Sequence, residues 1–283
     1  MERFRRDLEA LRKVFEIVPL TKVVEFNLGM HAPQIPYLAV TFDDGFNLCR
    51  KEVLQILDQL KIKATTFVIT SCLDNRNLMW RNKLSVIRAA VDEEVYLTKY
   101  NELMTKLDYL QITRGDQLMA ATENWDMSRK DEWADELWKR CGLPPLENYL
   151  DEHRPYFTWE GLSDWIACGH SVGFHTHTHP FCSRLRPEDM EREIFKPAIQ
   201  LKERLGLAPL PFSYPFGDRF RPEREEEIFR MNLFSCAFGI GGFAKRKTPG
   251  YRLEREEIEA TGAGWSVVGR PVVRFLRRDE GYR

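Results

Sequence analysis

The chain has 283 residues, of which 43% are hydrophobic and 30% charged, and its formal net charge is −1. That length suffices for one barrel-sized domain over residues 1–283, and so balanced a charge gives no general attraction to nucleic acid or anionic lipid. We expect an ordinary globular protein without a nucleic-acid partner.

Residues 1–18 predict a surface helix rather than a targeting segment. Phe4, Leu8, Leu11 and Phe15 recur at helical spacing, and acidic residues interrupt any apolar core of a signal peptide. No stretch is long and apolar enough to predict a membrane-spanning segment. The six cysteines form no C-x-x-C pair, which favours reduced thiols. We therefore expect a cytoplasmic protein.

A strand, a helix and a second strand are predicted next. Residues 37–42 form a short run rich in β-formers that ends abruptly at residues 43–45, Asp-Asp-Gly. Apolar positions within 53–60 predict a helix, and residues 64–70 predict the next strand. This order over the length of a crossover unit favours parallel pairing, with helices outside the sheet.

The pattern changes between about residues 80 and 156, where long, charged and mostly helical stretches predict a helical insertion. Its tryptophans at 125, 133 and 138 are expected to pack as the core of the insertion. After it, Thr158 is placed to cap a helix that Gly169 closes. Further strands are predicted at 171–174, 210–214 and 234–238, and further helices at 188–205 and 223–231.

The first motif that suggests chemistry is Thr-Phe-Asp-Asp-Gly at 41–45. Adjacent carboxylates repel each other unless a cation or a shared proton compensates, and the carboxyl end of a buried strand is where α/β barrels build active sites. Asp43 and Asp44 thus suggest one metal ligand and one base. Alone, the motif would be read as a turn that ends the strand.

The second motif is a cluster of three histidines, His175, His177 and His179. Histidine is the commonest nitrogen ligand of zinc, so the cluster suggests a metal site. In an extended chain, at ~3.3 Å per residue, His175 and His179 would lie roughly 13 Å apart, too far to share an ion. Either the chain curls after His175, or the ligands are two residues apart. Pro180 favours a turn, so we predict His175 with His179 and keep His177 as the weaker candidate.

Two further motifs are read as mimics. Residues 169–173 fit the G-x-S-x-G nucleophile elbow around Ser171, which would indicate a serine esterase. The elbow needs a strand before it and a helix after it, whereas the predicted order here is the reverse, and no histidine follows His179. A serine esterase that uses Ser171 is therefore kept only as the less favoured alternative. Residues 239–244 resemble a dinucleotide fingerprint, but Pro249 follows where a helix is needed, so we predict a glycine-rich loop.

The segments at 41–45, at 175–180 (His-Thr-x-x-His-Pro) and at 212–217 (Phe-Ser-Tyr-Pro-Phe-Gly) together resemble the polysaccharide deacetylase family. The resemblance implies an α/β fold, a distorted (β/α) TIM-like barrel that binds one divalent metal ion, usually Zn²⁺. It spans about residues 1–72 and 157–260 and leaves the helical insertion outside.

The resemblance also implies roles for individual residues. Asp43 would be the general base, Asp44, His175 and His179 the metal ligands, and a backbone N–H near Phe216 would help to hold the oxyanion. Tyr214 and Phe216 would bind the substrate by offering flat faces to a sugar ring. The implied reaction removes an N-acyl group, typically acetyl, from an amino sugar or glycoconjugate, so the expected partner is an N-acylated carbohydrate.

Two departures from the family pattern bear on activity. Many members hold the base with an arginine where this chain has Ser213. The acid that protonates the leaving amine is a histidine near the carboxyl end in many members and belongs to a Tyr-His pair ahead of the first helix in others, and neither is present. Either the start is truncated, or His31, His177 or a carboxylate substitutes, or turnover is weak. The alternative function is thus a weak or inactive carbohydrate-binding module, and the oligomeric state is left open.

Overall fold

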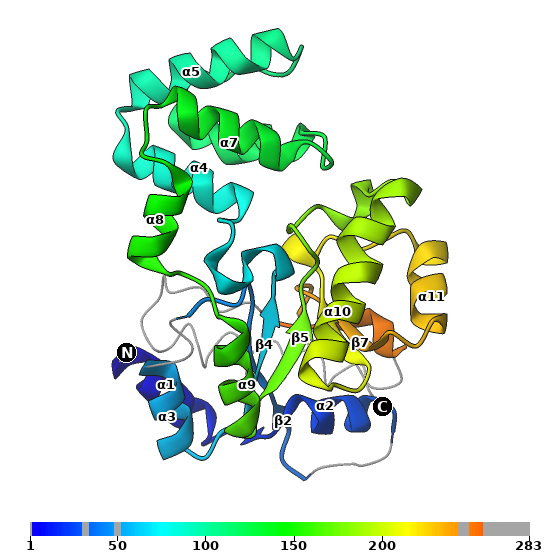
Figure 1. The fold of residues 1–283 in the computed structure, drawn as a ribbon. Helices are drawn as coiled ribbons and strands as arrows, with labels where there is room; N and C mark the ends of the chain where they lie inside the picture. Colours follow the sequence, from blue (N-terminus) through cyan, green and yellow to red (C-terminus); the bar gives the residue numbers. More distant parts are fainter. Residues whose placement is uncertain (1, 30–33, 48–51, 243–248, 257–283) are drawn as a thin grey trace.

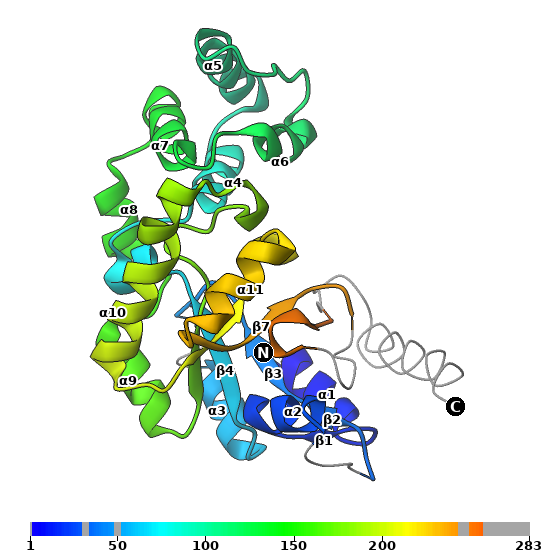
Figure 2. The ribbon, with the colours of Figure 1, turned by 90° about the vertical axis from the view of Figure 1, so that its right-hand side faces the viewer.

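A computed structural model describes residues 2–29, 34–47, 52–242 and 249–256 (Figure 1). Its centre is a six-stranded sheet, parallel throughout, in which the spatial order of the strands follows the chain. The sheet is curled into an open half-barrel, which confirms the predicted α/β barrel type (Figure 2). The strands are Val40–Phe42 (β3), Ala64–Val68 (β4), Ser171–Phe174 (β5), Leu210–Ser213 (β6), Phe234–Gly239 (β7) and Leu253–Glu254 (β8).

Helices connect the successive strands from β3 to β7, as the alternating sequence pattern predicts. Thr158 caps one of them by accepting a hydrogen bond from the backbone N–H of Gly161 at 3.0 Å, which confirms the predicted start. The predicted helix at 188–205 begins with a 3₁₀ turn, Pro187–Asp189, and a π-helical turn, Glu191–Phe195. The connecting helices are Leu54–Gln59 (α3), Trp159–Ala167 (α9), Lys196–Leu205 (α10) and Pro222–Arg230 (α11).

Two helices and two short strands precede the main sheet. Helix α1 spans Glu2–Leu11, within the helix predicted there, and helix α2 spans Leu20–Asn27. Between and after them, the short strands Glu16–Ile17 (β1) and Tyr37–Leu38 (β2) pair in parallel as a separate two-stranded sheet. The sequence reading missed α2 and β1 because two to eight residues give little periodic signal.

Alternate side chains along the strands point either into the hydrophobic core or to the opposite face of the sheet. Phe174, Phe212 and Tyr214 point to the sheet face that packs against the helices. Successive side chains of a strand point to opposite faces. His175 and Ser213, which alternate with these core residues, are therefore turned to the other face of the sheet.

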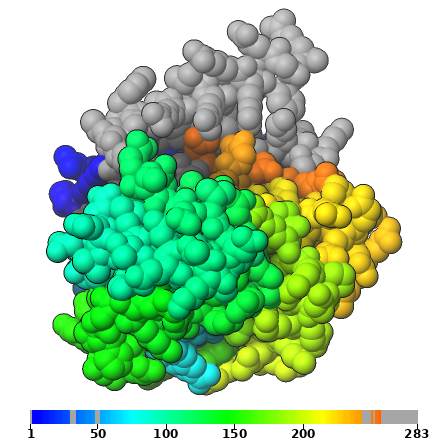
Figure 3. All heavy atoms as spheres, turned by 90° about the horizontal axis from the view of Figure 1, so that it is seen from above, coloured from blue at the N-terminus to red at the C-terminus, as the bar shows by residue number. Residues whose placement is uncertain are grey.

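The helical segment predicted at about 80–156 stands at the end of the sheet where β4 and β5 finish (Figure 1). Seen from above, the segment lies beside the region of α10 and α11 (Figure 3). The segment has its own hydrophobic core, in which Trp125, Trp133 and Trp138 are buried as predicted. Its helices are Trp80–Ala90 (α4), Glu93–Lys106 (α5), Leu118–Ala121 (α6), Lys130–Arg140 (α7) and Leu146–His153 (α8), with 3₁₀ turns at Gly115–Gln117 and Thr122–Asn124.

None of the helices in the described ranges has the length and apolar character that crossing a bilayer would demand. The described cysteines are free thiols: Cys72, Cys141, Cys168, Cys182 and Cys236. Cys49 and His31 lie outside the described residues.

Candidate metal centre

The acidic pair sits on a tight turn directly after β3. Asp44 and Gly45 both have left-handed backbone conformations, with φ of 67° and 70°. A Cβ atom at Gly45 would lie 3.0 Å from Cγ1 of Val68 and 3.3 Å from its Cα, so glycine lets the turn approach β4. A left-handed aspartate is strained, and such strain gathers at functional sites. The turn therefore presents both carboxylates at the carboxyl end of the sheet.

The chain curls after His175, as one of the two alternatives required. Thr176 and His179 have φ of 66° and 59°, and the hydroxyl of Thr176 accepts a hydrogen bond from the backbone N–H of His179 at 3.0 Å. The curl brings the Nε2 atoms of His175 and His179 to 3.1 Å. The imidazole of His177 instead hydrogen-bonds to the hydroxyl of Thr70 at 2.9 Å, away from this pair.

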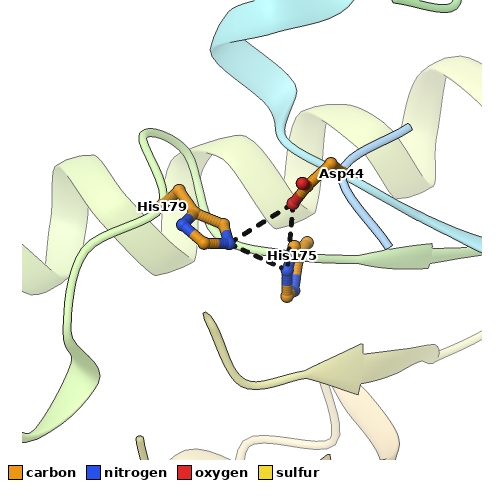
Figure 4. Close-up of side chains that lie close together, drawn as sticks. All are labelled: Asp44, His175 and His179. Carbon is orange, nitrogen blue, oxygen red and sulfur yellow. Dashed lines mark hydrogen bonds and ion pairs between the residues drawn. The ribbon is translucent and has the colours of Figure 1, made fainter. Parts of the chain in front are cut away.

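Asp44 completes a group of three potential ligands (Figure 4). Its Oδ1 lies 3.5 Å from Nε2 of His175 and 3.3 Å from Nε2 of His179. The ligand atoms of the three residues all lie within 4.8 Å of one another. The structure thus brings the predicted ligands together from two segments more than 130 residues apart in the sequence.

The chemistry of this group fits a divalent metal ion such as Zn²⁺. Nδ1 of His175 donates to the backbone carbonyl of Ser213 at 2.7 Å, which leaves the Nε2 lone pair directed at Asp44 and His179. Burial, followed by the nearness of His175, holds the pKa of His179 well below its usual value, which favours the neutral imidazole that a metal ion needs. Two imidazole nitrogens and one carboxylate are a ligand set of catalytic zinc sites.

The surroundings of Asp44 disfavour the charged form of its carboxyl group, and a bound cation would offset this effect. Burial raises the pKa of Asp44 to about 6; His175 opposes this effect and the charge of Asp43 adds to it. A bound cation favours the ionised form of a nearby carboxyl group and so reverses these influences. The raised pKa thus fits a carboxylate whose partner is a positive ion.

Asp43 is held by Arg255, which the sequence reading missed. The guanidinium donates from Nη1 to Oδ1 and from Nη2 to Oδ2 of Asp43, both at 2.8 Å. The hydroxyl of Ser213 donates to Oδ2 at 3.1 Å and accepts from Nη2 of Arg255 at 2.6 Å. Burial alone would raise the pKa of Asp43, but the charge of Arg255, the nearness of His175 and these hydrogen bonds hold it well below its usual value. Asp43 is therefore a fixed and ionised carboxylate, 3.9 Å from Nε2 of His175.

The helical segment also supports the histidine turn. The indole N–H of Trp80, on α4, donates to the backbone carbonyl of His179 at 2.9 Å. Lys130, on α7, is 1% exposed and donates to the hydroxyl of Thr178 at 2.5 Å and to Asp131 at 2.6 Å. Thr178 in turn donates its backbone N–H to the buried Glu193 at 3.0 Å. The turn that carries His179 is thus held from both sides.

Replacement of Lys130 by methionine is expected to weaken zinc binding by about tenfold, the lower end of the range for groups that orient metal ligands. The substitution removes the donor to Thr178 and the buried ammonium's ion pair with Asp131, so stability should also fall by about 1–3 kcal/mol. Competition with a chromophoric zinc chelator measures the affinity. Lys83→Met is the matched control, because Lys83 is equally buried on α4 but pairs with Asp135. It should lose stability and keep the zinc affinity; equal zinc affinities of the two variants would contradict the role of Lys130.

The two residues expected to bind the sugar differ in position. The Phe216 ring meets the His179 ring edge-on, with centroids 4.4 Å apart, so Phe216 borders the ligand group. Tyr214 is 1% exposed, and its hydroxyl donates to Glu225 at 2.8 Å. Because Ser213 faces Asp43, its neighbour Tyr214 points to the opposite side of the strand, into the helix-packed core. The geometry thus gives Tyr214 no ring face for a substrate.

Ser171 has no catalytic partners in the described residues. It begins β5, far from the carboxyl end, and its hydroxyl hydrogen-bonds to that of Thr65 at 2.7 Å. Its neighbour His170 accepts from the backbone N–H of Ala64 at 3.1 Å and stacks on Trp165. Helix α9 precedes this strand, so the reversed order predicted from the sequence is confirmed. The geometry gives no support to a serine esterase.

The glycine-rich stretch after β7 connects to the segment that carries Arg255. Gly242 donates its N–H to the carbonyl of Arg255 at 3.1 Å, and Arg255 donates to the carbonyl of Gly239 at 3.0 Å. Residues 243 and 244 lie outside the described ranges.

Several solved deacetylase structures are similar to this chain. They are the Streptococcus pyogenes deacetylase PplD in complex with acetate (TM-score 0.60, 14% identity, 95% of this chain and 85% of that one), IcaB from Ammonifex degensii (0.56, 18%, 95% and 87%) and a de-N-acetylase from Aggregatibacter actinomycetemcomitans (0.53, 12%, 95% and 86%). At these identities the likeness shows the fold alone. The comparison with curated proteins finds no match.

The sequence model of the polysaccharide deacetylase family matches residues 31–105 and 121–226, well over half of the chain. The match runs through most of the helical segment, so the expectation that the family likeness leaves this segment out is wrong. Together with the predicted motifs, the match identifies this chain as a member of the polysaccharide deacetylase family.

Proposed function

We propose that the protein is a metal-dependent hydrolase that removes the acetyl group from an N-acetylated amino sugar in a glycan or glycoconjugate. Members of its family remove acetyl groups from polysaccharides. The observation that carries the proposal is the convergence of Asp44, His175 and His179 beside an ionised Asp43. Acetate, the acid that such a reaction would release, is bound in the similar PplD structure.

Different residues would have different roles in this reaction. A divalent ion held by Asp44, His175 and His179 would polarise the acyl oxygen and make water more acidic. Asp43 would take the proton of the attacking water as general base. Its low pKa keeps it ionised but makes it a weaker base, so orientation is what Arg255 and Ser213 chiefly supply. A backbone N–H near Phe216 would receive the developing charge on the acyl oxygen.

A second candidate function, binding of a glycan with little or no turnover, is favoured by the positions of the other histidines. His177 bonds to Thr70, His170 stacks on Trp165, and His153 stacks on Tyr149. In the described ranges, none of these three histidines hydrogen-bonds to Asp43, Asp44 or the two proposed ligands, and His31 lies outside those ranges.

Measuring acetate release separates these candidates. The zinc-loaded protein is expected to release acetate from N-acetylated oligosaccharides such as chitooligosaccharides, to stop after removal of zinc with a chelator, and to recover after zinc is added back. Binding of the same oligosaccharides without acetate release would favour the second candidate. Binding neither metal nor oligosaccharide would count against both.

A further inference from the structure

An aromatic surface begins directly beside the proposed metal ligands. The Phe216 ring lies against His179, and the Phe181 ring lies 4.5 Å from Phe216 at an interplanar angle of 30°. Both phenylalanines are partly exposed. Flat apolar faces of this kind pack against the rings of sugars, so the pair offers a place for part of a glycan next to the reacting group.

Two arginines flank this aromatic pair. The guanidinium carbon of Arg81, on α4, lies 4.3 Å from the centroid of the Phe216 ring and 5.3 Å from that of Phe181. The guanidinium of Arg184 lies 5.1 Å from the Phe181 ring. The two ring contacts, of 4.3 and 4.4 Å, put the charge of Arg81 within about 9 Å of the His179 ring. A positive charge thus stands about one sugar residue away from the proposed metal site.

The guanidinium of Arg81 is poorly satisfied by its present partners. Its side chain is only 19% exposed, yet its hydrogen bond to the Met119 carbonyl is long, at 3.4 Å, and Glu123 lies 3.9 Å away with a largely exposed side chain. The buried Nε of Arg81 has no hydrogen-bond partner within the described part of the chain. Since the polar contacts of the Nη atoms in the described residues are this long hydrogen bond and a distant carboxylate, the guanidinium can still pair with an anionic group of a ligand.

We propose that Arg81, with Phe181 and Phe216, forms a subsite for an acidic sugar residue, one that carries a carboxylate or phosphate group, adjacent to the acetylated amino sugar. The planar guanidinium can pair with either group through two parallel hydrogen bonds. The aromatic pair packs against the ring of the acidic sugar. The proposed subsite depends on the proposed function only in one respect, the position of the acetylated sugar at the metal site. Binding of acidic glycans to the subsite does not require deacetylation.

Binding of matched probes to the zinc-loaded full chain tests the subsite. Calorimetry would compare a hyaluronan oligosaccharide, which alternates N-acetylglucosamine with glucuronate, with a chitooligosaccharide of equal length, and N-acetylglucosamine 1-phosphate with free N-acetylglucosamine. We expect at least one acidic probe to bind about tenfold or more tightly than its neutral partner. Which pair shows the preference distinguishes carboxylate from phosphate. Equal affinities within both pairs would overturn the proposal without any variant.

The variant Arg81→Gln should abolish this preference while neutral probes bind as before and the zinc content is unchanged. Arg88→Gln, on the exposed side of the same helix, is the control and should keep the preference. A preference that survives Arg81→Gln would overturn the assignment. Acetate release measured in parallel separates the two proposals: release without acidic preference rejects only the subsite, and Arg81-dependent binding without release rejects only the deacetylase activity.

Discussion

Asp43→Asn is expected to lower the rate of acetate release by about 10²–10⁴, the usual contribution of a general base, and to leave the metal content unchanged. The amide has nearly the shape of the carboxylate but accepts no proton from water. Asp43 lies beside the three ligand residues and its oxygens are bonded to Arg255 and Ser213, so the ion does not depend on it. Acetate assays and elemental analysis of the same preparations check both parts.

A graded control accompanies this variant. Ser213→Ala removes one of the three hydrogen bonds to Asp43 and keeps the Ser213 carbonyl that orients His175, so it should cost only a few-fold in rate. An Asp43→Asn protein with full activity would show that another group is the base. Loss of metal from the same protein would instead assign Asp43 as a ligand.

Arg255→Met is expected to reduce the rate by about 10²-fold, because small misplacements of a catalytic group have effects of this size. It should also move the acidic limb of the pH-rate profile to higher pH. Asp43 acts in its ionised form, so activity is lost as the pH falls through its pKa. Burial raises that pKa and Arg255 is the first influence that lowers it, so without the guanidinium the loss begins at a higher pH.

The matched control is Arg252→Met, on the same segment, because Arg252 pairs with Glu225 at 2.9 Å. It should keep both the rate and the pH profile. Arg255→Lys retains the charge but not the double hydrogen bond and should fall between the wild type and Arg255→Met. An unchanged pH profile in Arg255→Met would contradict the role of Arg255.

The sequence predicts most of the sheet and the pairing of His175 with His179, because both depend on local patterns. β5 spans the predicted residues 171–174, and Thr158 caps α9 as expected. The argument for that pairing is local. An extended chain would hold His175 and His179 too far apart to share an ion, and Pro180 favours the turn that brings them together. Periodicity, caps and motif spacing each act over a few residues, so a single sequence displays them.

The partner of Asp43 could not be found in this way. Arg255 follows a two-residue strand and lies 212 residues from Asp43, so no local pattern distinguishes it from the other arginines. Its position is set by the order of the sheet, in which β8 follows β7. The sheet face to which Tyr214 points could have been predicted, since strand alternation and the neighbouring Ser213 determine it. The burial of the Tyr214 hydroxyl against Glu225 could not be predicted, because it depends on how α11 packs on the sheet.

The most direct test of the whole account is the metal content of the purified, zinc-equilibrated and dialysed protein, compared among wild type, His175→Ala and His177→Ala. We predict about one metal ion per chain in the wild type, little or none in His175→Ala, and the wild-type content in His177→Ala, whose imidazole bonds to Thr70 instead. If His175→Ala bound as much metal as the wild type, or if only His177→Ala lost it, Asp44, His175 and His179 would not be the metal centre.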